Sequence, residues 1–122
     1  MGIRILGAIP GVIFLLQTIG WLFTPETAAE GLGMTVPAEG IGRSTLIGDF
    51  SAFFLSITVF IFLGTATQKA HWYQAGALLL GGAAALRTLA WAMHGAPFAT
   101  QFIVVEVVVA AILLFVASRA PE

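Results

Sequence analysis

The chain contains no cysteine and few charged residues, and each shortage excludes classes of protein. Without cysteine there is no disulfide, no thiolate nucleophile and no cysteine-ligated zinc or iron–sulfur cluster. Charged residues fill 9% of the 122 positions, against about 25% in soluble domains, and the net charge of -1 offers no basic surface for nucleic acid. Hydrophobic residues make up 59% of the chain, and the mean hydropathy is +1.01. This composition predicts an integral membrane protein with no nucleic-acid partner.

Four hydrophobic runs are long enough to cross a bilayer, because a helical span needs about 20 apolar residues. Arg4 ahead of the first run is also typical of a signal peptide, but the run exceeds the roughly 7–15 apolar residues of such a peptide, so we expect a retained span. Short connections between the runs predict an all-α, antiparallel four-helix bundle that forms a single domain. The four spans are predicted at residues 3–23, 45–64, 71–94 and 101–118, within a domain covering 1–122.

The first loop carries the signals of a short helix. Thr24 suits the N-cap, Pro25 suits the first helical position, and the acid Glu26 is favourable in the first turn. The few apolar residues that follow predict a helix on the surface. We expect Ser44 and Thr100 to cap the second and fourth spans.

The basic residues near the ends of the spans predict the orientation. Arg4, Lys69 and Arg119 fall on one side of the membrane, and Arg43 alone falls on the other. Because cytoplasmic loops carry the excess of lysine and arginine, both termini are expected in the cytoplasm and the first loop outside.

Three ionisable residues, Asp49, Arg87 and Glu106, lie inside three separate hydrophobic runs. A charge at membrane depth costs about 2.5–3.5 kcal/mol even on the mildest scale, so such residues usually face the interior of a bundle. With a rise of about 1.5 Å per residue, they lie roughly 6, 10 and 8 Å inside the outer ends of their spans. Gln17 lies at a comparable depth, about 9 Å, in the first span. The four residues are therefore predicted to share one polar layer.

Aromatic residues follow two of these charges at helical spacing. Phe53 and Phe60 lie on the same helix face as Asp49, and Trp91 follows Arg87 by one turn, where a cation–π contact is expected. One interpretation is a ligand pocket, and the other is a pair of stripes that pack helices together. The candidate ligand-binding residues are Gln17, Asp49, Phe53, Phe60, Arg87, Trp91, His94 and Glu106.

The charges also have a purely structural interpretation. Two acids, Asp49 and Glu106, balance two bases, Arg43 and Arg87, as a structural ion network would require. Intramembrane ionisable residues nevertheless indicate a functional site by default, because apolar residues would fill the same space without the desolvation cost. Both interpretations stay open at this point.

Three rows of small residues at four-residue spacing predict close helix contacts. Contact within the protomer is favoured, and a homodimer seam is the alternative. The rows are Gly7 with Gly11, Gly48 with Ala52 and Ser56, and Ala77 with Gly81 and Ala85.

Several chemistries find no support in the sequence. His71 and His94 stand about 34 Å apart along one span, so they cannot share a metal or a haem within a protomer. Neither a phosphate-binding loop nor a dinucleotide fingerprint is present. We assign no catalytic residue, no metal and no cofactor.

Two short motifs and one acid resemble a known family. They are Gly-Arg-Ser-Thr-Leu-Ile-Gly-Asp-Phe at 42–50, Gly-Gly-Ala-Ala-Ala-Leu-Arg at 81–87, and Glu106 in the last span. The chain thereby resembles the domain-of-unknown-function 4345 family of short bacterial four-span membrane proteins, which are distantly similar to DoxX-like proteins. The resemblance implies a four-helix protein of the bacterial inner membrane, and it implies no activity, substrate or cofactor.

The polar layer leads to one main functional hypothesis and several alternatives. In the main one, a membrane lipid or lipophilic small molecule, lipid-like or isoprenoid-like, presents its polar head to Asp49, Arg87 and Glu106. The first alternative is an accessory subunit that packs against a membrane-protein partner or a second copy of itself. An isomerase using the two carboxylates, or a small transporter, comes third.

Overall fold

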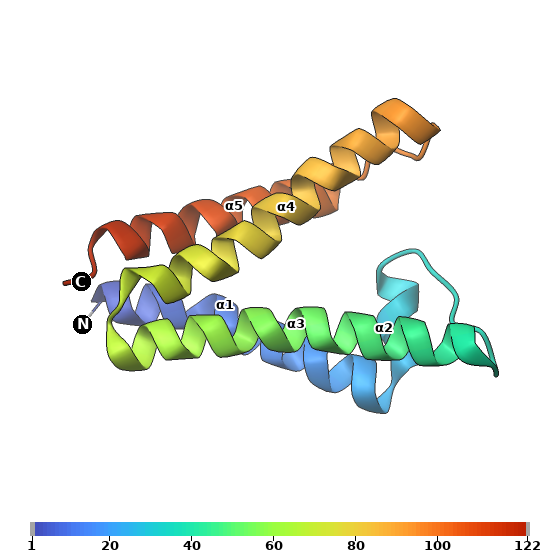
Figure 1. Ribbon diagram of the computed structural model, residues 1–122, viewed down its shortest axis with the longest axis horizontal. Coiled ribbons are helices and arrows are strands. Elements are labelled where there is room, and N and C mark those ends of the chain that lie inside the picture. The colour runs from blue at the N-terminus through green and yellow to red at the C-terminus, as the bar shows by residue number, and fades with distance from the viewer. Residues whose placement is uncertain (1, 122) are drawn as a thin grey trace.

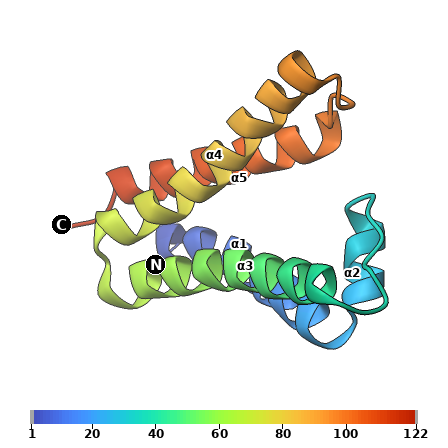
Figure 2. The same ribbon diagram turned by 45° about the vertical axis from the view of Figure 1, so that its right-hand side comes forward.

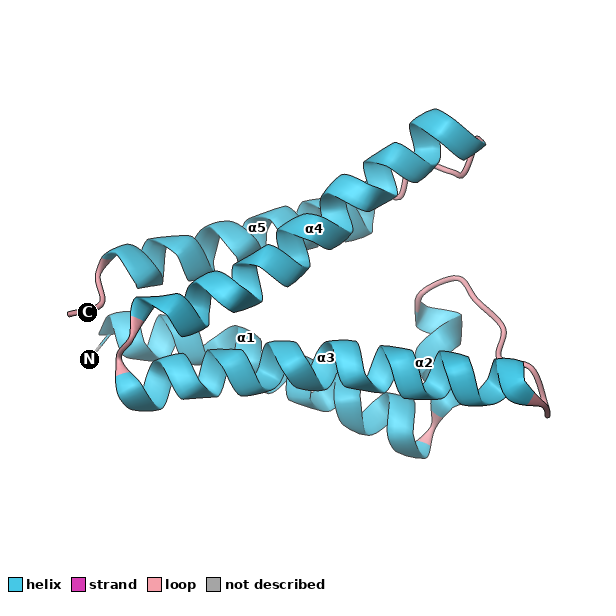
Figure 3. Ribbon diagram, in the orientation of Figure 1, coloured by secondary structure: helices cyan, strands magenta, loops and turns pink. Residues whose placement is uncertain are grey.

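A computed structural model describes residues 2–121, and the chain is all-helical there. The elements are α1 (Gly2–Phe23), α2 (Pro25–Gly31), α3 (Ile41–Thr67), α4 (Ala70–His94) and α5 (Thr100–Ser118). The four long helices are long and apolar enough to cross a membrane, and α2 is the short helix expected in the first loop. The predicted all-α four-helix bundle is confirmed (Figure 3).

The long helices form two antiparallel pairs, α1 with α3 and α4 with α5 (Figure 1). The pairs meet at the end of the molecule that holds both chain termini and the α3–α4 connection. They diverge toward the end that holds α2 and the α4–α5 connection, and the turned view shows the same wedge shape (Figure 2). The bundle is therefore closed at one end and open at the other.

Tyr73 on α4 fills the closed end. Its side chain is 1% exposed, and its hydroxyl donates a hydrogen bond to Thr65 Oγ1 at 3.2 Å. A Cβ added at Gly7 on α1 or at Gly64 on α3 would lie 3.0 Å from the tyrosine ring, closer than a normal contact. Gly11 is equally crowded by side chains of α3. The row of Gly7 and Gly11 is thus confirmed as a packing face, because absent side chains let the ring enter between helices.

The other two rows of small residues do not pack inside the protomer in the same way. A Cβ added at Gly48 or at Gly81 would meet no atom within 4 Å, and Ala52 and Ala85 are exposed. Ala77 is the one residue of these two rows that is buried in the core. The prediction of close internal contact is wrong at Gly48, Ala52, Gly81 and Ala85, because these positions face open space or are exposed.

The helix starts differ from the expected caps. α3 begins at Ile41, directly after Gly40, whose φ of 88° makes the turn that glycine tolerates, so Ser44 lies within the helix. Thr100 is the first residue of α5 rather than its cap, and its hydroxyl bonds to the carbonyl two residues earlier. Thr24 stands at the N-cap of α2, but its hydroxyl donates back to α1 instead of accepting from α2. The caps predicted at Ser44 and Thr100 are wrong.

Arg4 on α1 forms hydrogen bonds to the end of α3 at the closed end. Its Nε donates to Thr65 O at 2.8 Å and its Nη2 donates to Ala66 O at 3.2 Å, satisfying carbonyls in the last turn of α3. Lys69 and Arg119 belong to this same end, and Arg43 belongs to the open end. The cytoplasmic location of the termini stays a prediction.

Candidate functional site: a cleft between the helix pairs

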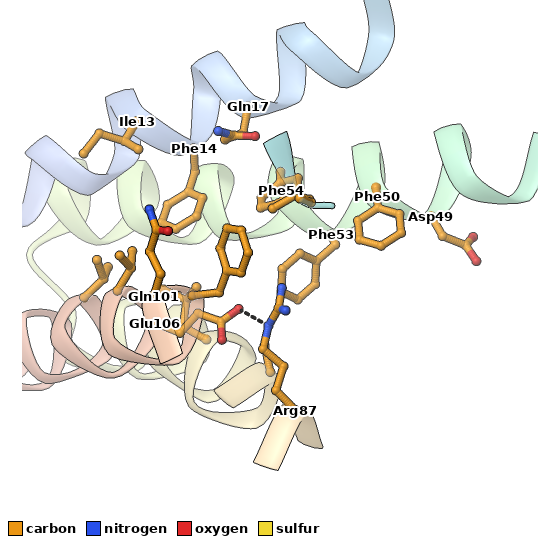
Figure 4. A pocket seen from close by; sticks show the side chains of 16 residues that line it. Ile13, Phe14, Gln17, Asp49, Phe50, Phe53, Phe54, Arg87, Gln101 and Glu106 are labelled. Carbon is orange, nitrogen blue, oxygen red and sulfur yellow. Dashed lines mark hydrogen bonds and ion pairs between the residues drawn. The ribbon is translucent and has the colours of Figure 1, made fainter. Parts of the chain in front are cut away.

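The wedge between the two pairs contains a cleft of about 570 Å³, within the range of small-molecule sites. All four long helices contribute to its walls, and most of the lining side chains are apolar or aromatic (Figure 4). The lining consists of Ile13, Phe14, Gln17, Leu32, Asp49, Phe50, Phe53, Phe54, Leu80, Ala83, Arg87, Gln101, Phe102, Val105, Glu106 and Val109.

Stacked phenylalanines build the wall that the α1–α3 pair presents. The rings of Phe14 and Phe54 stack with centroids 5.9 Å apart, and Phe53 meets Phe54 edge to face at 5.3 Å. Phe50 stacks on the fully buried Trp21 at 4.7 Å. Each ring of this wall is therefore in contact with another aromatic ring.

An ion pair between α4 and α5 forms the polar part of the opposite wall. Arg87 Nε donates to Glu106 Oε2 at 3.2 Å, and the two side chains are 33% and 12% exposed. The guanidinium also lies over the ring of Phe102, 5.0 Å from its centroid. Phe102 and Glu106 are one helical turn apart on α5, so a single face of that helix holds the guanidinium from two directions.

This ion pair leaves polar groups free to bond with something else. Glu106 Oε1 is buried and has no hydrogen-bond partner among the described residues. Within residues 2–121, Arg87 donates only through Nε, so its two amino groups are uncommitted. A buried unpaired acceptor costs about 1–3 kcal/mol. The pair therefore offers uncommitted donors of Arg87 at the edge of the cleft, beside an unpaired acceptor, Glu106 Oε1, that neighbouring protein atoms cover.

Asp49 lines the cleft but does not join this pair. Its side chain is exposed, makes no hydrogen bond or ion pair with any residue in the described chain, and points away from Arg87 (Figure 4). The predicted polar layer does not bring Asp49 into contact with Arg87 or Glu106, because α3 diverges from α4 toward the open end. Gln17 does reach the same cleft, from α1.

Arg43 pairs outside the cleft. Its Nη1 donates to Glu26 Oε2 at 2.6 Å and to Pro37 O at 3.2 Å, which ties α2 to the start of α3. The hydrogen bond from the Arg43 guanidinium holds the pKa of Glu26 below its ordinary value. The predicted network of Arg43, Asp49, Arg87 and Glu106 is wrong: the described residues form two separate pairs.

The predicted aromatic residues divide between the cleft and other surfaces. Phe53 lines the cleft, whereas Phe60 on α3 stacks on Trp72 of α4, outside the cleft lining, with centroids 6.0 Å apart. Trp91 is exposed and meets Phe98 edge to face at 5.2 Å. His94 is exposed at the last turn of α4. The cation–π contact predicted between Arg87 and Trp91 is wrong, since Phe102 takes that place.

Sequence reasoning missed much of the aromatic lining. The sequence could have indicated Phe102, because it precedes Glu106 by four residues, about one turn, and so lies on the same helix face. Phe14, Phe50 and Phe54 had none, since one phenylalanine among many apolar neighbours does not reveal which face meets a cleft.

Residues 2–121 define a multi-pass α-helical membrane protein with a largely apolar cleft between its helix pairs and one charged pair on the cleft wall that α4 and α5 form. Within those residues no three His, Asp or Glu side chains come together as a metal site. The chain matches no protein-family model, no curated protein and no solved structure. The resemblance to the family of short bacterial four-span proteins therefore stays a prediction.

Proposed function

We propose that this protein binds an amphiphilic, lipid-like or isoprenoid-like molecule in the cleft between its helix pairs. The polar end lies at Arg87 and Glu106, and the apolar body lies against Phe53 and its neighbours. The observation that supports this most is the cleft itself: about 570 Å³ of mostly apolar lining with one charged pair at its side. Ligand sites have this general form, a largely apolar surface with a few convergent polar groups.

The polar pair determines which molecules stay in the cleft. Acyl chains are as apolar as the lining, so moving an apolar body from the bilayer into the cleft brings little hydrophobic gain. Hydrogen bonds to Arg87 and Glu106 are different, because the hydrocarbon core offers no water to replace them. The head of the ligand thus supplies the selectivity, and its tail supplies the fit.

The wedge shape supports access from the bilayer. The two pairs separate progressively toward the open end (Figure 2), and the cleft lies between them. Because the four long helices cross the bilayer, lipid borders the sides of the space between the pairs. With both termini in the cytoplasm, as the basic residues predict, the open end lies in the outer leaflet. The resemblance named above supports the bacterial inner membrane as the location.

A cleft-filling substitution tests this function. Ala83 lines the cleft on α4, and Ala85 on the same helix is exposed outside it. We expect Ala83→Trp to remove the lipid that native mass spectrometry detects on the purified protein, while Ala85→Trp leaves it in place. Equal lipid content in both variants would contradict a ligand in the cleft, and equal thermal midpoints would show that both are folded.

A second candidate function is that of an accessory subunit in a membrane complex. The exposed small residues Gly48 and Ala52 on α3 favour it, because such a row permits close approach of another helix and is not used within the protomer. Purification from native membranes in mild detergent discriminates the two: a stoichiometric protein partner favours a subunit, and bound lipid without a partner favours a binding protein. We do not propose the isomerase, since Asp49 is directed away from Glu106.

A further inference from the structure

The polar edge of the cleft is electrically balanced. The charges of Arg87 and Glu106 cancel across their 3.2 Å contact, and the other polar lining residues apart from Asp49, namely Gln17 and Gln101, are uncharged. Asp49 is exposed and points away from the pair. We infer that the cleft selects an uncharged headgroup carrying a hydrogen-bond donor beside an acceptor, as an alcohol does, over anionic and cationic headgroups. This inference rests on the proposed binding function.

A hydroxyl matches the free groups of the pair. Glu106 Oε1 is a buried acceptor without a partner among the described residues, and the amino groups of Arg87 are uncommitted donors. One hydroxyl both donates and accepts, so it can accept from the guanidinium and, when the Glu106 carboxylate turns to expose Oε1, donate to that oxygen.

Other headgroups fit less well. An anionic head needs Arg87, but the buried Glu106 carboxylate already holds that guanidinium and repels a second negative charge. A cationic head meets the opposite conflict, with Arg87 as the repelling group. A hydrocarbon without a polar head leaves Glu106 Oε1 unsatisfied.

Photolabelling tests this preference. The probe is hexadecanol carrying a diazirine near its tail end, added to the full-length protein in nanodiscs of zwitterionic lipid. The competitors are hexadecanol, hexadecanoic acid at a pH where it is ionised, hexadecyltrimethylammonium and hexadecane, which share a chain and differ in the head. Labelled residues are mapped by mass spectrometry.

The expected result is labelling at the cleft aromatics, displaced by hexadecanol at a concentration about tenfold lower than by the other three, the ratio that one good hydrogen bond to a charged group provides. Cleft labelling displaced equally by all four, or best by a charged competitor, would overturn the headgroup inference and leave the binding function standing. Labelling spread over the lipid-facing surface, without enrichment in the cleft, would overturn both.

Two variants sharpen the test. Glu106→Gln leaves Arg87 as an unbalanced positive charge, so hexadecanoic acid should become the better competitor by about tenfold. Glu39→Gln, a change of the same type in the exposed first loop, should keep the preference for the alcohol. An unchanged preference in Glu106→Gln would contradict the inference. If that variant does not fold, the double variant Arg87→Met with Glu106→Leu serves instead: it should bind hexadecanol and hexadecane equally, and a retained alcohol preference would overturn the proposal.

Discussion

Arg87 and Glu106 are joined across α4 and α5 by one hydrogen bond, Nε to Oε2 at 3.2 Å, with the second carboxylate oxygen buried and unpaired within the described chain. A structural pair would be expected to satisfy both oxygens, because each unpaired buried acceptor is costly. The half-satisfied geometry, placed on the wall of a cleft, is what makes this pair a candidate site.

Breaking the pair should destabilise the protein more than removing it. Glu106→Leu leaves Arg87 without its counter-charge, and we expect a loss below the roughly 3–5 kcal/mol typical of fully buried pairs, because Arg87 is one-third exposed. Replacing both residues, Arg87→Met with Glu106→Leu, should recover most of that loss. Unfolding of the single and double variants in mixed micelles measures the difference. Additive losses would contradict a direct interaction.

The closed end should respond to added volume where the open end does not. Gly7→Ala places a Cβ about 3.0 Å from the Tyr73 ring, and overpacking of this kind costs about 1–3 kcal/mol. Gly48→Ala meets no atom within 4 Å, so we expect no loss and a gain of up to about 1 kcal/mol from helix propensity. Thermal unfolding of the two variants in the same detergent checks this contrast. An equal response from both would contradict the packing of the closed end.

Acid should loosen the attachment of α2 to α3. The hydrogen bond from Arg43 lowers the pKa of Glu26 from its ordinary value of 4.5, so the charged pair is complete above pH 4.5. Because the folded pKa is the lower one, the stabilisation is lost as pH falls through that lowered value. The protection factors of the α2 amides, which correct for the pH dependence of intrinsic exchange, should fall at low pH in the wild type. Glu26→Gln should show the reduced protection at every pH, and a persistent pH step in the protection of that variant would contradict this assignment.

The orientation is testable because the chain has no native cysteine. Single cysteines at Glu39, in the first loop, and at Lys69, between α3 and α4, lie at opposite ends of the bundle. We expect an impermeant maleimide to label Glu39→Cys from outside the cell and Lys69→Cys only after permeabilisation. The reverse pattern would place the open end of the cleft in the inner leaflet.

The sequence alone predicted the positions of the helices and one contact of the site. Hydrophobic run length located all four spans within a few residues, and the charges of Arg87 and Glu106 in adjacent spans indicated a pair. The position of Asp49 could not be foreseen, because depth along a helix says nothing about the divergence of neighbouring helices. The ion pair between Arg43 and Glu26 was not predicted. It forms because α3 begins earlier than the hydrophobic run and brings Arg43 close to α2.

The cleft itself lay beyond sequence reasoning for a related physical reason. Phe53 and Phe60 lie on similar faces of α3, two turns apart, yet the first lines the cleft and the second packs on Trp72. Which of them meets open space depends on where the two pairs separate. The pairs meet at the closed end, where Tyr73 packs between Gly7 and Gly64, a tertiary arrangement without a local signal.

The central claim is that an amphiphile occupies the space between the helix pairs, with its head at Arg87 and Glu106. An experimental structure of the protein in native lipid tests it most directly. We expect elongated non-protein density in the cleft, running along Phe53 and ending within hydrogen-bond distance of the Arg87 guanidinium and the Glu106 carboxylate. Helix pairs closed against each other, with Phe53 in contact with Val105 and no density between them, would contradict it.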